Sequence, residues 1–130
     1  MKKRIFNYCV VGTIGYVTDA FLLFLVLRYT SLNALQGRAI SFLVAVFVTW
    51  RLNRKFTFAT AKNLAGHAGL EEFARYLAAN FLGISMNLGI YTILVLKFPF
   101  FSASPQFAVA AGSIAALTVN FMLSNYWVFK

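Results

Sequence analysis

Charged residues are scarce in this sequence. They make up 12% of its 130 residues, whereas hydrophobic residues make up 61%. Soluble domains carry about 25% charged residues, so this composition excludes an ordinary water-soluble fold. The chain is also too short for a second domain. We therefore expect one domain, covering residues 1–130, that lies in a membrane.

Cysteine and histidine each occur once, which removes several kinds of site. Cys9 alone cannot form an intrachain disulfide or a metal cluster of thiolates. His67, the one histidine, lies in a polar stretch, and it does not form a catalytic pattern with a serine and an acidic residue. The sequence also has no glycine motif of the kind that holds nucleotide phosphates. We expect no enzyme, no cofactor, no metal site and no energy coupling through ATP bound to this chain.

Long apolar runs are abundant. A helix needs about 20 apolar residues to cross a hydrocarbon core of roughly 30 Å. Four such runs span about residues 5–27, 39–58, 76–96 and 107–129. Short polar turns join the first run to the second and the third to the fourth, and the polar stretch at about 59–75 is predicted to be the one sizeable loop. The expected fold class is an all-α integral membrane protein with four transmembrane helices, arranged as two helical hairpins.

The distribution of basic residues predicts how the chain crosses the membrane. One side of the four spans would carry Lys2, Lys3, Arg4, Arg51, Arg54, Lys55, Lys62, Arg75 and Lys130, and the other side Arg28, Arg38 and Lys97. By the positive-inside rule, the richer side, with both termini and the loop, lies in the cytoplasm. The net charge of +9 would suggest nucleic acid for a soluble protein, but here these side chains meet lipid headgroups. We expect a multi-pass protein of the cytoplasmic membrane that binds no nucleic acid.

The two predicted hairpins resemble each other in sequence. Tyr8, Gly15 and Asp19 fall in register with Tyr76, Gly83 and Asn87, and Leu52, Phe56 and Phe58 fall in register with Leu123, Trp127 and Phe129. Each copy has two spans, so both copies would cross the membrane in the same direction. We therefore predict an internal repeat whose halves are related by an axis along the membrane normal.

Asp19 is the least expected residue, because it lies inside the first apolar run. An ionised carboxylate at that depth costs about 2.5–3.5 kcal/mol. The cost is offset if the carboxyl is neutral, pairs with a basic residue or faces water in a cavity. Asp19 shares a helix face with Gly15, as Asn87 does with Asn80 in the third run. These faces can line a polar groove or join neighbouring helices by hydrogen bonds, and both interpretations stay open.

Basic residues form a ridge at the end of the second run. Arg51, Arg54 and Lys55 stand at positions i, i+3 and i+4, so they share one helix face. Snorkelling of long side chains to the headgroups explains Arg54 and Lys55. Arg51 lies about two helical turns inside the end, where a guanidinium suits bidentate contact with a phosphate. The ridge therefore predicts an anion site.

Three short segments occur in an order that a known family shares. They are residues 7–15 (NYCVVGTIG) followed by Asp19, residues 53–58 (NRKFTF), and residues 120–129, which begin Asn-Phe and end Tyr-Trp-Val-Phe. With four spans and this length, the chain resembles the GtrA-like family, small four-span membrane proteins associated with cell-surface polysaccharide synthesis. The resemblance covers nearly the whole chain. It implies translocation of a polyprenyl-phosphate-linked monosaccharide across the cytoplasmic membrane, or assistance to the enzymes that make or use such lipids.

Under this resemblance, we expect Arg51 and Arg54 to bind the lipid phosphate from the cytoplasmic side. Hydrogen bonds to sugar hydroxyls would come from a polar groove formed by Asp19, Asn80, Asn87 and Asn120. Arg28 and Arg38, near the outer face, would receive the phosphate after crossing, although orientation signals explain these two nearly as well. The implied partners are the sugar lipid, membrane lipids and membrane glycosyltransferases, and a second copy of the chain is a further candidate.

Two other functions are compatible with four spans. In the first, the protein transports nothing and serves as a membrane anchor or partner of a glycosyltransferase, with its polar stripes making helix contacts. In the second, it is a small proton-coupled exporter of cations that uses Asp19. The strong topological bias and the cationic ridge count against a cation exporter.

Overall fold

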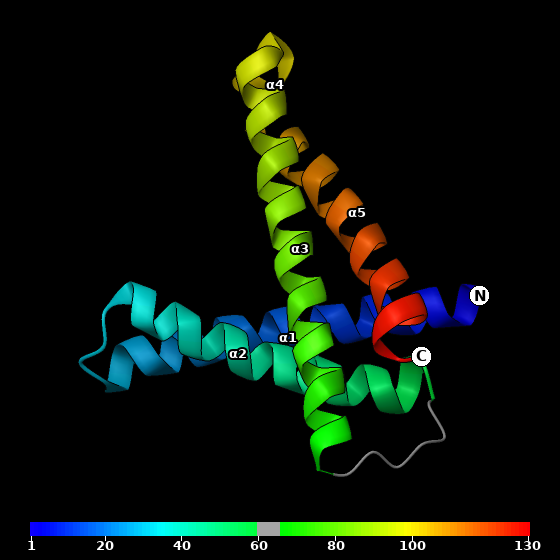
Figure 1. The fold of residues 1–130 in the computed structure, drawn as a ribbon. Coiled ribbons are helices and arrows are strands. Elements are labelled where there is room, and N and C mark those ends of the chain that lie inside the picture. Colours follow the sequence, from blue (N-terminus) through cyan, green and yellow to red (C-terminus); the bar gives the residue numbers. More distant parts are fainter. Residues whose placement is uncertain (60–65) are drawn as a thin grey trace. The chain divides into compact units, whose positions relative to one another are not determined.

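The computed structural model describes residues 1–59 and 66–130, and every regular element in these two ranges is a helix. The elements are α1 (Lys2–Tyr29), α2 (Ala34–Leu52), η1 (Asn53–Thr57), α3 (His67–Lys97), α4 (Pro99–Ala103), α5 (Pro105–Leu123) and η2 (Ser124–Val128). The chain forms two compact units, Met1–Ala65 and Gly66–Lys130. We call them the first and the second hairpin, and Figure 1 shows the helices that belong to each.

Four helices in the described part of the chain are long and apolar enough to cross a membrane. They are Lys2–Tyr29, Ala34–Thr57, His67–Lys97 and Pro105–Val128, with mean hydropathies of 2.0, 1.2, 1.6 and 1.7. At about 1.5 Å per residue, even the spans of 24 residues are about 36 Å long and exceed a hydrocarbon core of about 30 Å. The predicted all-α membrane fold with four spans is confirmed.

A capping box fixes the turn of the first hairpin. The Asn33 side chain accepts a hydrogen bond from the Gln36 backbone N–H at 2.8 Å, and the Gln36 side chain accepts one from the Asn33 N–H at 3.2 Å. The second helix therefore begins at Ala34, five residues before the predicted start at 39. Gly37 follows, and a Cβ there would lie 3.1 Å from Leu27 Cδ2. The glycine thus lets α2 approach α1 closely.

Close approach recurs deeper in both hairpins. Gly15 of α1 faces the Thr49 methyl group of α2, and a Cβ at Gly15 would overlap it. In the second hairpin Gly83 of α3 lies against the Asn120 side chain of α5 in the same way. Small residues at these crossings are typical of helix packing in membranes, where close contact replaces the hydrophobic effect.

The turn of the second hairpin has a different construction. The short helix α4 occupies it, and Pro99 and Pro105 are the first residues of α4 and α5. Proline fits the first position of a helix because its missing N–H would have no helical partner there. Neither α4 nor α5 has a side-chain cap.

Each hairpin ends in one π-helical segment. The Phe58 N–H donates to the Asn53 carbonyl at 2.9 Å in η1, and the Phe129 N–H donates to the Ser124 carbonyl at 3.0 Å in η2. Figure 1 shows η2 as the last coil before the C-terminus. Both phenylalanines pack on a tyrosine of the partner helix. In the first hairpin, the ring centroids of Tyr8 and Phe58 are 6.1 Å apart.

The ring of Tyr76 likewise lies 5.7 Å from that of Phe129. The ring pairs and the π segments join the residues that the sequence register aligns, which supports the predicted repeat. The repeat itself stays a prediction, as does the orientation with both termini in the cytoplasm.

The predicted third span and the loop before it need a correction. The third helix begins at His67 and not at 76, so residues 67–75 are helical and not part of a loop. These residues are polar, but several of them are good helix formers. Arg75 Nη1 also donates a hydrogen bond to Glu71 Oε1, one turn earlier, at 3.1 Å. Residues 60–65 of the predicted loop, with Lys62, lie outside the described residues. The other spans match the predicted bounds to within five residues.

Candidate functional site

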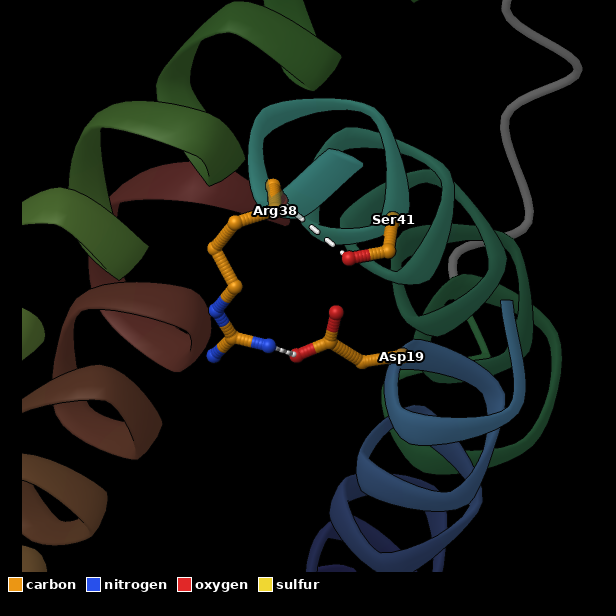
Figure 2. Close-up of polar contacts among 3 residues, drawn as sticks. All are labelled: Asp19, Arg38 and Ser41. Atoms are coloured by element: carbon orange, nitrogen blue, oxygen red, sulfur yellow. Dashed lines mark hydrogen bonds and ion pairs between the residues drawn. The ribbon is translucent and has the colours of Figure 1, made fainter. Parts of the chain in front are cut away.

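An ion pair joins the two helices of the first hairpin. Arg38 Nη1 of α2 lies 2.5 Å from Asp19 Oδ2 of α1, as Figure 2 shows. Asp19 is buried, whereas the Arg38 side chain is 56% exposed. The guanidinium therefore offsets the charge of a carboxylate inside a membrane-spanning helix. Of the three ways to offset this charge that the sequence left open, the structure shows the ion pair.

Local structure around Arg38 holds this geometry. The side chain extends from the first turns of α2, whose start is set by the capping box at Asn33. Ser41, one turn later, is fully buried and donates to the Arg38 carbonyl at 3.2 Å. Gly37 brings the two helices close at this level. The long arginine side chain can then reach Asp19 across the helix contact.

Both partners of the ion pair keep unused hydrogen-bonding capacity. Asp19 Oδ1 is buried and has no hydrogen-bond partner among the described residues. Figure 2 shows this oxygen pointing toward Ser41. The guanidinium of Arg38 has five N–H donors in a planar fork, and the contact with Asp19 is made by Nη1 alone. The exposed remainder suits a phosphate or another oxyanion.

In the second hairpin two of the three predicted amide residues, Asn87 and Asn120, lie at the contact between α3 and α5. The Asn80 amide donates to the Tyr76 carbonyl of its own helix at 2.9 Å. Asn120 packs its side chain on Gly83, and its Oδ1 is buried without a partner among the described residues. Asn87 Nδ2 lies 3.4 Å from Ser113 Oγ. These contacts favour the packing interpretation for Asn87 and Asn120, and they leave an unused acceptor on Asn120.

Asn87 also borders a groove on the second hairpin. The groove has a volume of about 330 Å³ and is lined by Ile84, Asn87, Leu88, Tyr91 and Val109. Val109 occupies the register position of Arg38, so the place that holds an ion pair in the first hairpin holds apolar side chains and one amide in the second. Asp19 and Asn87 therefore occupy equivalent positions in different chemical surroundings.

The cationic ridge lies at the opposite end of α2 from Arg38. Arg51 is exposed, and its guanidinium carbon lies 5.7 Å from the centre of the Trp50 ring. Lys55 Nζ lies 5.2 Å from the centre of the Phe56 ring. Arg54, half-buried, belongs to the same end. Both exposed cations thus lie in cation–π contact with an aromatic ring of the neighbouring residue.

The structure thus brings together Asp19 and Arg38 from two different predicted sites, one for the sugar and one for the outer phosphate. Arg28, the other cation that we predict near the outer face, is exposed in the last turn of α1. The sequence interpretation missed the contacts of Asn7 and Ser41. Asn7 Nδ2 donates a hydrogen bond to the Phe56 carbonyl at 2.9 Å. The one feature of the sequence that pointed to Asn7 is that it begins residues 7–15, the first of the three family-like segments.

Comparison with protein-family models agrees with this architecture. The model of the GtrA/DPMS transmembrane domain matches residues 7–129, which takes in all four spans. A search of curated proteins found no match. The family match supports a role in handling glycosyl lipids at a membrane. This chain is therefore a multi-pass membrane protein that belongs to the GtrA/DPMS transmembrane-domain family.

Proposed function

We propose that the protein moves a polyprenyl-phosphate-linked monosaccharide across the cytoplasmic membrane for the synthesis or modification of a cell-surface polysaccharide, and that it catalyses no reaction itself. One observation carries this proposal. Helix α2 has an exposed guanidinium near each of its ends, Arg38 at one and Arg51 at the other. A lipid that crosses the membrane presents its phosphate first at one face and then at the other.

The spacing of the two arginines fits that task. Arg38 and Arg51 are 13 residues apart on one helix, which corresponds to about 20 Å at 1.5 Å per residue. A hydrocarbon core of about 30 Å has its headgroup boundaries about 10 Å further apart than these two residues. Long arginine side chains bridge the remaining distance by snorkelling. Each guanidinium can thus meet a phosphate at its own boundary.

Asp19 gives Arg38 a further property. A carrier has to bind its substrate strongly enough to accept it and weakly enough to release it. The carboxylate already neutralises part of the Arg38 charge, so a phosphate that arrives there is held less strongly than by an isolated arginine. We therefore assign Asp19 a double part, as the charge partner of Arg38 and as an acceptor for sugar hydroxyls through Oδ1.

Unused acceptors inside the spans support a sugar path. Asp19 Oδ1 and Asn120 Oδ1 are buried without partners among the described residues. An unsatisfied buried acceptor costs about 1–3 kcal/mol, and sugar hydroxyls are donors that would satisfy it. Asn87 offers an amide at the edge of its groove. Each of these groups is polar within an otherwise apolar span.

A non-transporting partner of a glycosyltransferase is the second candidate. The packing of Asn120 on Gly83 favours it, because amides that serve helix contacts need no substrate. A proton-coupled cation exporter is less well supported. Its carboxylate would have to be free to exchange a proton for a cation, whereas Asp19 is paired with Arg38.

The test is transbilayer movement of a polyprenyl-phosphate monosaccharide in liposomes that contain the purified protein. We expect movement with wild type and none in protein-free liposomes. Arg51→Ala should slow movement about tenfold or more, the effect of losing one charge-assisted hydrogen bond. Lys97→Ala is the matched control, because it removes an exposed cation from the last turn of α3. Equal rates for both variants and wild type would remove the phosphate site from the proposal, and an absence of movement across several sugar lipids would favour the glycosyltransferase partner.

A further inference from the structure

A second groove lies at the end of the first hairpin that carries the N-terminus. Its volume is about 260 Å³, and it is lined by Phe6, Asn7, Val10, Val11, Ile14, Leu52 and Phe56. Six of these seven side chains are apolar. The α1 residues extend from Phe6 to Ile14, about 12 Å along the helix. The groove is therefore an elongated apolar surface between α1 and the η1 end of the second span.

Cations stand at the end of this groove that is nearest the N-terminus. Lys55 Nζ lies 5.2 Å from the centre of the Phe56 ring, which is one wall of the groove. Lys3 lies one helical turn before Asn7, on the same face of α1. Both lysines are exposed. An apolar groove with two ammonium groups at one end fits a ligand that has an anionic head and an apolar chain.

The one polar group within the groove holds its wall in place. Asn7 donates to the Phe56 carbonyl at 2.9 Å, one of the carbonyls that the end of a helix leaves without a helical partner. This bond fixes the Phe56 backbone, from which the wall and the neighbouring Lys55 extend.

The register positions in the second hairpin have the opposite character. Glu71 stands where Lys3 stands in the first hairpin, and Tyr126 stands where Lys55 does. The positions of Phe6 and Val10 are both alanine there. Charge and side-chain volume thus distinguish the end of the first hairpin from the same end of the second.

We propose that this groove binds the prenyl chain of a polyprenyl phosphate next to its head, with the phosphate held by Lys3 and Lys55. The proposal rests on the proposed function, because that function supplies the class of lipid. It adds a site for the chain and two phosphate ligands, beside Arg51 and Arg54. The first part of the chain then lies on the protein, and only the remainder extends into the bilayer.

The test is photolabelling of the full-length protein in detergent micelles with a prenyl monophosphate that carries a diazirine on its chain. We expect the label on residues 6–14 of α1, identified by mass spectrometry of the peptides. Val10→Trp fills the groove and should reduce labelling about tenfold. Val17→Trp is the matched control: it places the same side chain two turns further along the same face, outside the groove, and should label as wild type does.

A charge variant tests the head end without altering the groove. Lys55→Glu should weaken competition by unlabelled prenyl phosphate about tenfold, since it removes a charge-assisted contact with the phosphate. Competition by the corresponding prenyl alcohol should be the same in this variant and in wild type. Retained elution volume and helical circular dichroism show that each variant is folded.

Three results would overturn the inference. They are labelling of Val10→Trp at the wild-type level, equal competition by inorganic phosphate, and equal competition by phosphatidylglycerol, which would make the groove a site for any anionic lipid. Because binding in micelles requires no movement, the two proposals fail separately. Labelling in the groove without movement in liposomes contradicts the transport function alone, and movement that Val10→Trp leaves unchanged contradicts the groove alone.

Discussion

The two hairpins share their packing contacts and differ in their ionic residues. A glycine of the first helix faces a side chain of the second at equivalent positions, Gly15 with Thr49 and Gly83 with Asn120. Both hairpins end in a π-helical segment whose last aromatic residue packs on a tyrosine. The ion pair of Asp19 and Arg38 joins the two helices of the first hairpin, whereas the pair of Glu71 and Arg75 in the second hairpin lies within α3.

The positions of the differences indicate what the ionic residues are for. Arg38, Arg51 and Lys55 of the first hairpin correspond to Val109, Met122 and Tyr126 of the second. The second hairpin forms the same contacts without these cations, so packing does not require them. These cations are costly in a membrane, and in the proposed function phosphate binding accounts for their presence in the first hairpin. The phosphate contacts in the proposed function therefore all belong to the first hairpin.

The largest effect on stability should come from the second hairpin, at Gly112. A Cβ there would lie 2.7 Å from the Asn87 carbonyl oxygen, a backbone atom that cannot rotate away. We expect Gly112→Ala to lower the free energy of unfolding by about 1–3 kcal/mol, measured by denaturant unfolding in detergent with circular dichroism. Gly89→Ala is the control, since nothing lies within 4 Å of its added Cβ. Equal stability of both variants would show that the α3–α5 spacing is looser than described.

Removal of Arg38 should have the next largest effect. Arg38→Ala leaves Asp19 buried without its charge partner. The pair is half-exposed, so we expect a loss of about 1–2 kcal/mol, between the values for exposed and buried pairs. The double variant Asp19→Asn/Arg38→Ala gives the first hairpin the neutral amide of the second and should recover most of the loss. A double variant as unstable as the single one would contradict the role of Asp19 as the partner.

The two turns should differ in their response to loss of a side chain. Asn33→Ala removes the capping box of α2 and should cost about 1 kcal/mol of unfolding free energy. Ser104 is the equivalent residue before α5, where no side-chain cap is formed. Ser104→Ala should therefore change the same measurement very little. A reversed order of these two effects would break the comparison of the turns.

The smallest effect is expected at the Glu71–Arg75 pair of α3. Glu71→Ala should cost only about 0.3–0.5 kcal/mol, because the carboxylate is largely exposed. The loss should vanish in about 1 M salt, where exposed charges are screened. A larger loss, or one that salt leaves unchanged, would mean that this pair holds the start of the third helix.

The spans could be predicted from the sequence, because apolar length is a direct requirement of the bilayer. The start of α3 could not. Residues 67–75 are helical without an apolar face, and a pattern of hydrophobicity has nothing to detect there. The π-helical segments could not be predicted either. The change from i+4 to i+5 hydrogen bonding extends over only five residues, too few for a distinct period of hydrophobic residues to appear in the sequence.

The candidate site, too, could be predicted from the sequence only in part. The need of Asp19 for a compensating group follows from the membrane alone. Its partner does not, because the contact with Arg38 depends on how the turn at Asn33 aligns the two helices. The groove beside Lys55 was beyond prediction for the same reason, as its walls come from segments about 50 residues apart in the chain.

The most direct test of the account is the rate at which a polyprenyl-phosphate monosaccharide crosses liposome membranes that contain Arg38→Gln. Glutamine keeps a donor for Asp19 and removes the charge that would hold a phosphate. The account predicts a folded variant whose transport is about tenfold slower than that of wild type. A variant that transports at the wild-type rate would contradict the claim that the first hairpin holds the phosphate near both ends of α2.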